Sequence, residues 1–296
     1  MPEGLEAEIW RRAAEPLVGR RLVEVVVDER VATPGLVEAV TGRRIEAVER
    51  RGKVVLLRLD AGPDAATAAG AADEDAAGAA RGVAAGAAAE VAVGSGSVSV
   101  GLHFGMTGRL IVDGRAAIER LTYASGADRA EWDRLVCRTD PPPPDPTVPA
   151  LRFNDPRRLG RVSLDPDLSA LGPDVFDLAA AGWGERLGSR RAAVKSLLLD
   201  QSVVAGLGNL CADEVLLHAG IAPRRSAASL TDSDLGDIAR ACRERLPVML
   251  AAGGSTHGDL SPERRVPGGR CPFDGAELTR ATIGGRTAVW CPRHQR

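Results

Sequence analysis

The chain has 296 residues, 44% of them hydrophobic and only 3% aromatic, with a formal net charge of −2 at pH 7. The length is typical of two domains, and the near-neutral charge means that any nucleic-acid-binding surface must come from local clustering of basic side chains. No apolar run is long enough to span a membrane, no secretory leader is found, and five scattered cysteines form no disulfide pattern. We therefore expect a cytoplasmic protein without a membrane partner.

The N-terminus combines a helix signal with a chemically reactive start. Residues 3–18 carry apolar side chains at i, i+4 spacing, which predicts an amphipathic helix. Pro2 carries a free secondary amine once Met1 is removed, and such amines attack carbonyl carbons to form Schiff bases. Glu3 is positioned to move a proton at the same centre. Both residues also suit an ordinary helix start, and the first residues alone favour that structural interpretation.

The first half of the chain is rich in strand patterns. Residues 61–95 interrupt them with low-complexity Ala, Gly, Asp and Glu, which predicts a disordered or weakly helical insertion without a catalytic role. We expect residues 53–59 and 98–103 to pair as a hairpin around this insertion, and residues 33–41 to form a short helix or a turn. The other predicted strands are 21–27, 45–48, 109–112, 134–139 and two within 151–164 around a basic turn. Residues 2–165 are therefore predicted to form a β-sandwich-like domain with flanking helices.

The second half has helical patterns, and residues 166–260 are predicted to form a separate helical domain. Glycines 206 and 208 form a tight turn before a helix, and backbone N–H groups at such a turn bind phosphate well. Asn209 adds a side-chain donor and Lys195 a positive charge, although such a turn is often only structural. The predicted helices are 168–171, 182–187, 193–199, 212–219 and 232–251.

The last segment, residues 261–296, carries two pairs of candidate metal ligands. Cys271 and Asp274 form one pair at x2 spacing, and Cys291 and His294 form the other after sixteen residues. This pattern is typical of a zinc ribbon, and aspartate and histidine are admissible zinc ligands. The alternative is a hairpin that has lost its metal and keeps two free thiols.

Lysine and asparagine are rare in this chain. Lys53 and Lys195 stand against 36 arginines, and Asn154 and Asn209 are the two asparagines. Lysine is a compact charge and arginine a planar fork, so the two do not substitute freely. A lysine that persists in an arginine-rich chain therefore indicates a position where its particular chemistry is needed.

Several motifs occur together and in one order. They are Pro2-Glu-Gly, Arg50-Arg-Gly-Lys53, His103-Phe-Gly-Met-Thr-Gly108, Asn154-Asp-Pro-Arg-Arg158, Leu198-Leu-Asp-Gln201 followed by Gly206-Leu-Gly-Asn209, and the terminal finger. In this combination the chain resembles the formamidopyrimidine-DNA glycosylase / endonuclease VIII family over nearly its whole length. Both lysines and both asparagines fall inside or beside these motifs, which favours the catalytic interpretation of Pro2.

The resemblance implies an α+β fold: an N-terminal β-sandwich domain with flanking helices, a helix-two-turn-helix domain, and a terminal β-hairpin that binds zinc. It implies a monomeric enzyme of damaged double-stranded DNA that is both a glycosylase and an abasic-site lyase and flips the target nucleotide. Pro2 would attack C1′ of the sugar and form a Schiff base, after which β- and δ-elimination cut the strand. Glu3 would act on the sugar oxygen, Glu6 would support the site, and Lys53 would bind a phosphate near Pro2.

The resemblance also assigns contacts to DNA. Glu6, Lys195, Asn209 and Arg286 are expected among the DNA-binding residues, the last two through phosphates beside the flipped nucleotide. Met106 would fill the space that the flipped nucleotide leaves, and Arg157 would contact the orphaned base. Leu159 stands where the purine-specific branch usually has phenylalanine, which weakens stacking on that base.

Three interpretations of function remain open. Pro2-Glu-Gly4 and Leu171-Gly-Pro-Asp-Val175 resemble the endonuclease VIII branch, whereas Asp155-Pro-Arg-Arg158 and Gly253-Gly-Ser-Thr-His-Gly-Asp259 resemble the formamidopyrimidine branch. We favour removal of oxidised purines such as 8-oxoguanine and formamidopyrimidines, with oxidised pyrimidines as the second possibility. A protein that binds lesions without catalysis is the third, although the presence of both Pro2 and Glu3 argues against it. A zinc ion on Cys271, Asp274, Cys291 and His294 is expected, with Asp274 and His294 standing where the family usually has cysteine.

Overall fold

The computed structural model describes residues 2–62, 96–119, 121, 126–179 and 181–296. The predicted insertion at residues 61–95 therefore lies outside the described residues from position 63 onward. Within the described part of the chain, no helix combines the length and apolar character that a membrane crossing requires.

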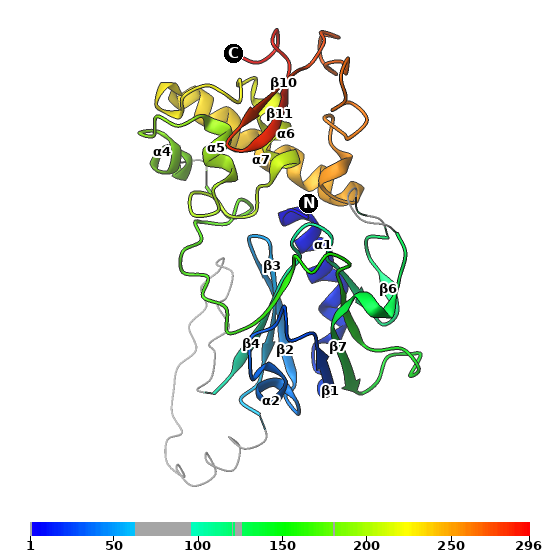
Figure 1. The fold of residues 1–296 in the computed structure, drawn as a ribbon. Helices are drawn as coiled ribbons and strands as arrows, with labels where there is room; N and C mark the ends of the chain where they lie inside the picture. The colour runs from blue at the N-terminus through cyan, green and yellow to red at the C-terminus, as the bar shows by residue number, and fades with distance from the viewer. Residues whose placement is uncertain (1, 63–95, 120, 122–125, 180) are drawn as a thin grey trace, which may run out of the picture.

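The N-terminal half contains two antiparallel sheets (Figure 1). Side chains from both sheets and from helix α1 (Gly4–Ala14) form one buried hydrophobic cluster, which includes Trp10, Leu57 and Leu151. One sheet pairs, in this order, β1 (Arg21–Val27), β7 (Asp133–Asp140), β8 (Leu151–Asn154), β5 (Arg109–Val112) and β6 (Arg115–Ala116). The other pairs β2 (Ile45–Arg51), β3 (Val54–Leu59), β4 (Val98–His103) and β9 (Arg161–Leu164). This confirms the predicted mixed fold with a β-sandwich.

Two strand predictions have consequences for the site. The hairpin across the insertion is confirmed, because β3 and β4 are antiparallel with Val54 opposite His103 and Leu59 opposite Val98. By contrast, the two strands around the basic turn do not pair with each other, since β8 belongs to one sheet and β9 to the other. The turn at residues 155–160 therefore carries the chain between the sheets, at one end of the sandwich.

The C-terminal half is helical and ends in a hairpin. Its helices are α4 (Gly182–Leu187), α5 (Val194–Leu199), α6 (Asn209–Ala219) and α7 (Asp232–Ala252), and its hairpin is β10 (Thr279–Ile283) with β11 (Arg286–Trp290). The short elements are α2 (Leu36–Val40) and the 3-10 turns Glu15–Leu17, Ala130–Trp132, Ala227–Ser229 and Ser255–His257.

One helix prediction is wrong and another begins too late. Residues 168–171 form a turn rather than a helix, because four residues make too few i→i−4 hydrogen bonds to offset helix nucleation. Helix α6 begins at Asn209, three residues before its predicted start. The cause is a cap that comes from the other end of the chain, as described below.

The two halves meet at the start of α1 (Figure 1). The N–H of Gly4 donates to the carbonyl of Gly206 at 2.8 Å, and a β-carbon on Gly4 would lie 2.8 Å from that oxygen. Gly206 has a φ of +106°, a conformation that favours glycine. The N-terminus is therefore packed directly against the glycine turn that precedes α6.

Candidate active site at the junction of the two halves

Glu3 joins the N-terminus to helix α6. Its buried carboxylate accepts the N–H groups of Leu210 at 2.7 Å and of Gly208 and Cys211 at 3.0 Å each. These are the first N–H groups of α6, which have no partner inside the helix and lie at the positive end of its dipole. The long-range cap both starts α6 at Asn209 and fixes the carboxylate beside buried Pro2.

Glu6 accepts a hydrogen bond from the backbone of Glu3 and so fixes the start of α1. Its Oε2 accepts the N–H of Glu3 at 2.7 Å, and its Oε1 accepts the N–H of Ser255, in the loop after α7, at 2.6 Å. Burial, together with the negative charge of Glu3, raises the pKa of Glu6. Both oxygens of buried Glu6 are thus used inside the protein, so its predicted contact with DNA is not supported, and it positions Glu3 instead.

Lys53 lies in the turn between β2 and β3 and is close to the same centre. Burial lowers the pKa of its ammonium group, and the nearby charge of Glu3 partly offsets this effect. The arrangement places a desolvated lysine near the carboxylate of Glu3, the residue that follows Pro2.

The Lys53 turn is held in place by Asp174, a buried residue that the sequence reasoning did not select. Its carboxylate accepts two hydrogen bonds from Arg50, at 2.6 and 2.9 Å, and the N–H of Gly52 at 2.8 Å. Asp174 also bridges to the glycine turn, pairing with Ala205. The β2–β3 turn is therefore fastened to the side chain of Asp174, and the turn before α6 to the backbone around the same residue.

A second buried aspartate organises the end of the sandwich. Asp155 accepts the N–H groups of Leu159 and Gly160, at 2.8 Å each, and the hydroxyl of Thr107. The turn that carries Met106 thus lies against the turn that carries Arg157 and Leu159. Arg157 is exposed, Leu159 is 44% exposed and Met106 is half-buried, so all three side chains are available to a ligand at this end.

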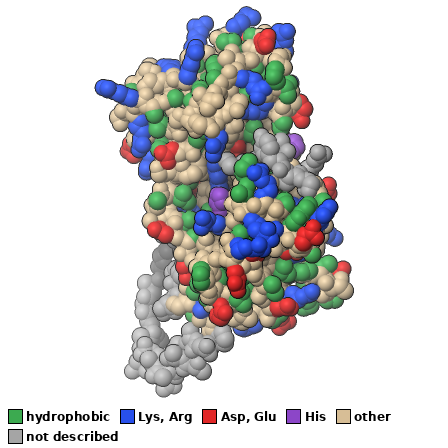
Figure 2. Space-filling model, viewed as in Figure 1, with side chains coloured by type: hydrophobic (Ala, Val, Ile, Leu, Met, Phe, Trp, Pro, Cys, Tyr) green, Lys and Arg blue, Asp and Glu red, His purple; other side chains and the backbone are tan. Residues whose placement is uncertain are grey.

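Asn209 and Arg286 line one cavity of about 400 Å³ between α6 and the terminal hairpin. The side-chain Oδ1 of Asn209 is buried and has no hydrogen-bond partner. Three arginines, Arg265, Arg280 and Arg286, line this cavity, and Figure 2 shows further Lys and Arg side chains on the C-terminal half of the molecule. The cavity combines an unsatisfied polar group with positive charge, which suits an anion.

Lys195 does not reach this surface, so its predicted contact with DNA is not supported. The side chain is fully buried, with Nζ 2.6 Å from Asp213 Oδ1 and donating to the carbonyl of Thr287 at 3.0 Å. The ion pair and the backbone bond compensate the cost of burying its charge. Lys195 instead fastens β11 to α6.

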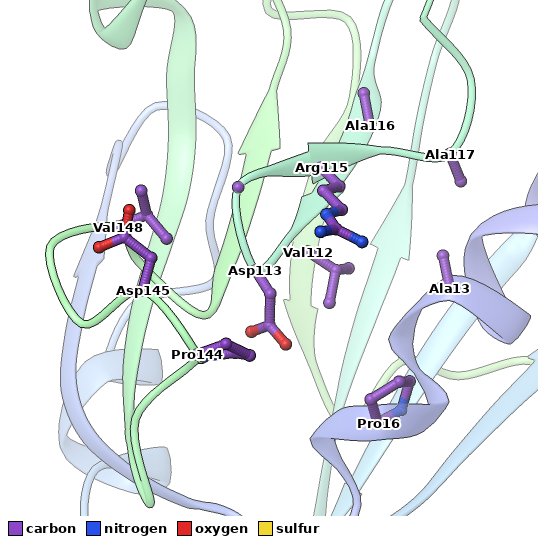
Figure 3. Close-up of a pocket in the computed structure, with 11 residues that line it drawn as sticks. Ala13, Pro16, Val112, Asp113, Arg115, Ala116, Ala117, Pro144, Asp145 and Val148 are labelled. Carbon is purple, nitrogen blue, oxygen red and sulfur yellow. The ribbon is translucent and has the colours of Figure 1, made fainter.

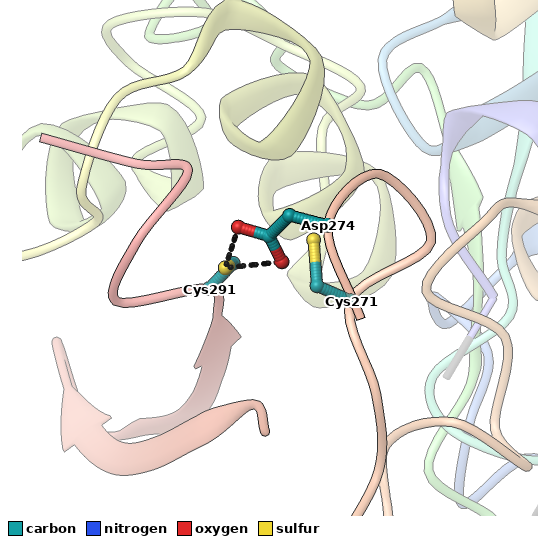
Figure 4. A group of neighbouring side chains, drawn as sticks. All are labelled: Cys271, Asp274 and Cys291. Carbon is teal, nitrogen blue, oxygen red and sulfur yellow. Dashed lines mark hydrogen bonds between the residues drawn. The ribbon is translucent and has the colours of Figure 1, made fainter. Parts of the chain in front are cut away.

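Three of the four predicted metal ligands come together at the base of the hairpin. The ligand atoms of Cys271, Asp274 and Cys291 lie within 4.8 Å of one another (Figure 4). His294 is not part of this cluster. Its Nε2 lies 2.9 Å from the carbonyl of Leu217, and its ring stacks on Phe273 at 4.6 Å.

The donor set still fits zinc. Thiolate and carboxylate are both zinc ligands, and a structural site needs a fourth. Because a carbonyl only accepts, Nε2 of His294 must be the protonated nitrogen, which leaves the lone pair on Nδ1. A ring N–H on a backbone carbonyl is the usual support of a metal-binding histidine.

A further cavity, of about 720 Å³, lies at the other end of α1 (Figure 3). It is lined by Ala13, Pro16, Val112, Asp113 and Arg115 with their neighbours, and by none of the predicted site residues. The reactive groups are therefore assembled at the junction and not in this hollow.

Comparison with known proteins agrees with this arrangement. The family described as formamidopyrimidine-DNA glycosylase N-terminal domain matches residues 1–162, and formamidopyrimidine-DNA glycosylase H2TH domain matches residues 170–260. The chain is 34% identical to a formamidopyrimidine-DNA glycosylase of Stenotrophomonas maltophilia and 32% identical to one of Halorhodospira halophila, in each case over 100% of both chains.

Solved structures show the same fold. The MutM (Fpg) protein of Thermus thermophilus superposes with a TM-score of 0.72 at 28% identity, over 99% of this chain and 98% of that one. Lactococcus lactis Fpg in a complex with abasic-site DNA superposes with a TM-score of 0.71 at 23% identity, over 99% of each chain.

Proposed function

Because the chain belongs to the formamidopyrimidine-DNA glycosylase family, we propose that it is a monomeric base-excision repair glycosylase that removes oxidised purines from duplex DNA and then cuts the strand as a lyase. The observation that carries this proposal is the fixed position of Glu3 beside Pro2. Three backbone N–H groups hold the carboxylate of the residue that follows Pro2, with Lys53 near it.

The proposed reaction begins when the damaged nucleotide turns out of the helix and its sugar reaches Pro2. The proline nitrogen forms a bond to C1′, and the bond from C1′ to the base breaks. The base leaves with the electron pair and takes up a proton, which is balanced by the proton that the proline N–H loses. Glu3 transfers a proton to the ring oxygen as the C1′–O4′ bond opens, which leaves an iminium ion between Pro2 and C1′.

Strand cleavage follows from the iminium ion, because it makes the proton on C2′ acidic. Loss of that proton and departure of the 3′ phosphate is the β-elimination, and departure of the 5′ phosphate is the δ-elimination. Water then hydrolyses the imine and returns Pro2. The positive charge of Lys53 stabilises the phosphate that leaves beside Pro2.

The remaining contacts would hold the DNA. Asn209 and Arg286 would bind phosphates at the cavity between α6 and the hairpin, which fixes the register of the strand but reads no sequence. Met106 and Leu159 would fill the emptied stack, and Arg157 would face the unpaired base. Their two turns are tied together by Asp155, which supports a joint role.

Substrate class is tested by cleavage of two duplexes, one with 8-oxoguanine opposite cytosine and one with thymine glycol opposite adenine. Faster cutting of the first supports the proposal. Faster cutting of the second supports the alternative of oxidised pyrimidines. Tight binding to both duplexes without cutting would support a lesion-binding protein instead.

We further propose that the hairpin holds one structural zinc ion on Cys271, Asp274 and Cys291, with Nδ1 of His294 as the fourth ligand. A zinc ion there would keep the hairpin, and with it Arg286, in position. Metal analysis of the purified protein tests this, with about one zinc per chain expected and much less in a Cys291→Ser variant. Metal-free protein with an intact hairpin would contradict it.

A further inference from the structure

The cavity lined by Asn209 and Arg286 is also lined by a polar side chain with one unpartnered atom. Arg265 also lines this cavity, and its side chain is only 10% exposed. Its Nη2 donates to Asp213 Oδ2 at 2.7 Å and to the carbonyl of Thr287 at 3.2 Å. Its Nη1 is buried and has no hydrogen-bond partner.

A buried donor without a partner costs free energy and calls for an explanation. The cavity is lined by two side chains with such an atom, because Oδ1 of Asn209 is also buried and has no hydrogen-bond partner. The oxygen and nitrogen of an amide are interchangeable by a 180° rotation, so Asn209 can present a donor here. One acceptor-rich ligand in the cavity would satisfy both side chains.

The charges specify which ligand fits. Among the residues that line the cavity, Arg265, Arg280 and Arg286 are positive and none is acidic. The nearest carboxylate to Arg265, Asp213, is also paired with Lys195 at 2.6 Å, so this buried group of three carries one net positive charge. A phosphodiester oxygen is an anion that an arginine fork binds well.

We propose that Arg265 is a DNA-binding residue that contacts a backbone phosphate through Nη1, together with Asn209 and Arg286. Its guanidinium can make both contacts at once, since Nη2 donates to Asp213 and Nη1 remains free to donate to the phosphate. Asp213 and the carbonyl of Thr287 hold the guanidinium in place before DNA arrives, so little side-chain entropy is lost on binding. The proposal rests on the proposed function, because it assumes duplex DNA as the ligand.

The test is a salt titration of binding to a duplex with a tetrahydrofuran abasic-site analogue, which is not cut, so that binding is measured apart from catalysis. We expect Arg265→Ala to weaken binding roughly tenfold, as for one lost charge-assisted hydrogen bond. The slope of log affinity against log salt should fall in magnitude by about 0.9, as for one lost phosphate contact. Arg264→Ala, at the exposed neighbouring position, should change the affinity and the slope much less.

The Arg265→Lys variant distinguishes a contact with the phosphate from a purely structural role in the ion pair with Asp213. A single ammonium group can pair with Asp213 but cannot also reach the phosphate, so we expect a wild-type melting temperature with weakened binding and a reduced salt slope. A wild-type salt slope in Arg265→Ala would overturn the proposal, and so would wild-type binding by Arg265→Lys. If Arg265-dependent binding is found but lesion duplexes are never cut, the proposed glycosylase activity fails and this contact stands.

Discussion

Gly208 lies directly against the carboxylate of Glu3. Its N–H donates to Glu3 Oε2 at 3.0 Å, and a β-carbon on Gly208 would lie 2.3 Å from the carboxyl carbon. Any side chain at position 208 must therefore displace the group that we propose transfers the proton.

We expect Gly208→Ala to lower the rate of strand cleavage by roughly a hundredfold or more, the typical contribution of a positioned acid or base. The measurement is single-turnover cleavage of an 8-oxoguanine duplex. Gly236→Ala is the matched control, because a β-carbon there meets no atom within 4 Å. It lies inside α7 and should keep full activity while stabilising the fold by about 0.5–1 kcal/mol. Equal rates for the two variants would contradict the role of Glu3.

The Asp174–Arg50 pair predicts a stability effect. Asp174→Asn removes the charge from a buried carboxylate that accepts two Arg50 hydrogen bonds and the Gly52 N–H. Breaking a buried ion pair typically costs about 3–5 kcal/mol. We expect a loss in that range by urea unfolding, against a change within about 0.5 kcal/mol for Asp237→Asn, whose pair with Arg240 is partly exposed. A small loss at Asp174 would show that the Lys53 turn is held by other contacts.

Glu6 predicts a pH dependence of stability. Burial and the charge of Glu3 raise the pKa of Glu6 in the folded chain above 4.5. The folded state then binds the Glu6 proton more tightly than the unfolded state, so this contribution to stability is complete below pH 4.5 and is lost as the pH rises through the folded pKa.

Glu6→Gln removes this titration. We expect the free energy of unfolding of the wild type, minus that of the variant, to fall as the pH rises from about 4.5, with a slope of at most about 1.4 kcal/mol per pH unit. Chemical unfolding at a series of pH values measures it. A difference that is constant or grows with pH would contradict the assignment.

The sequence predicted the bounds of helices and strands better than the contacts between residues that are far apart in the chain. The strand at residues 109–112 and the helix at 182–187 have the predicted bounds, because their apolar patterns are local. The start of α6 was missed because its cap, Glu3, lies more than 200 residues away in the chain. Local pattern carries no information about such a partner.

In the candidate site, too, the residues were predictable from the sequence but most of their contacts were not. Pro2, Glu3 and Lys53 were selected from their chemistry and motifs, and the structure brings them to one junction. Asp155 lies in the Asn154-Asp-Pro-Arg-Arg158 motif and Asp174 in Leu171-Gly-Pro-Asp-Val175, yet nothing in the sequence shows which backbone N–H groups they accept. Lys195 was misjudged for the opposite reason, since a rare lysine indicates a special position but does not distinguish a buried ion pair from a surface contact.

The central claim is that Pro2 forms the covalent intermediate, and reductive trapping tests it most directly. Borohydride converts an imine between protein and sugar into a stable amine, so protein that has lost Met1 should become covalently attached to an 8-oxoguanine duplex. We expect this adduct to be strong for the wild type and much weaker for Pro2→Gly. Absence of the adduct with both the lesion duplex and an abasic duplex, from protein shown by mass to begin at Pro2, would contradict the account.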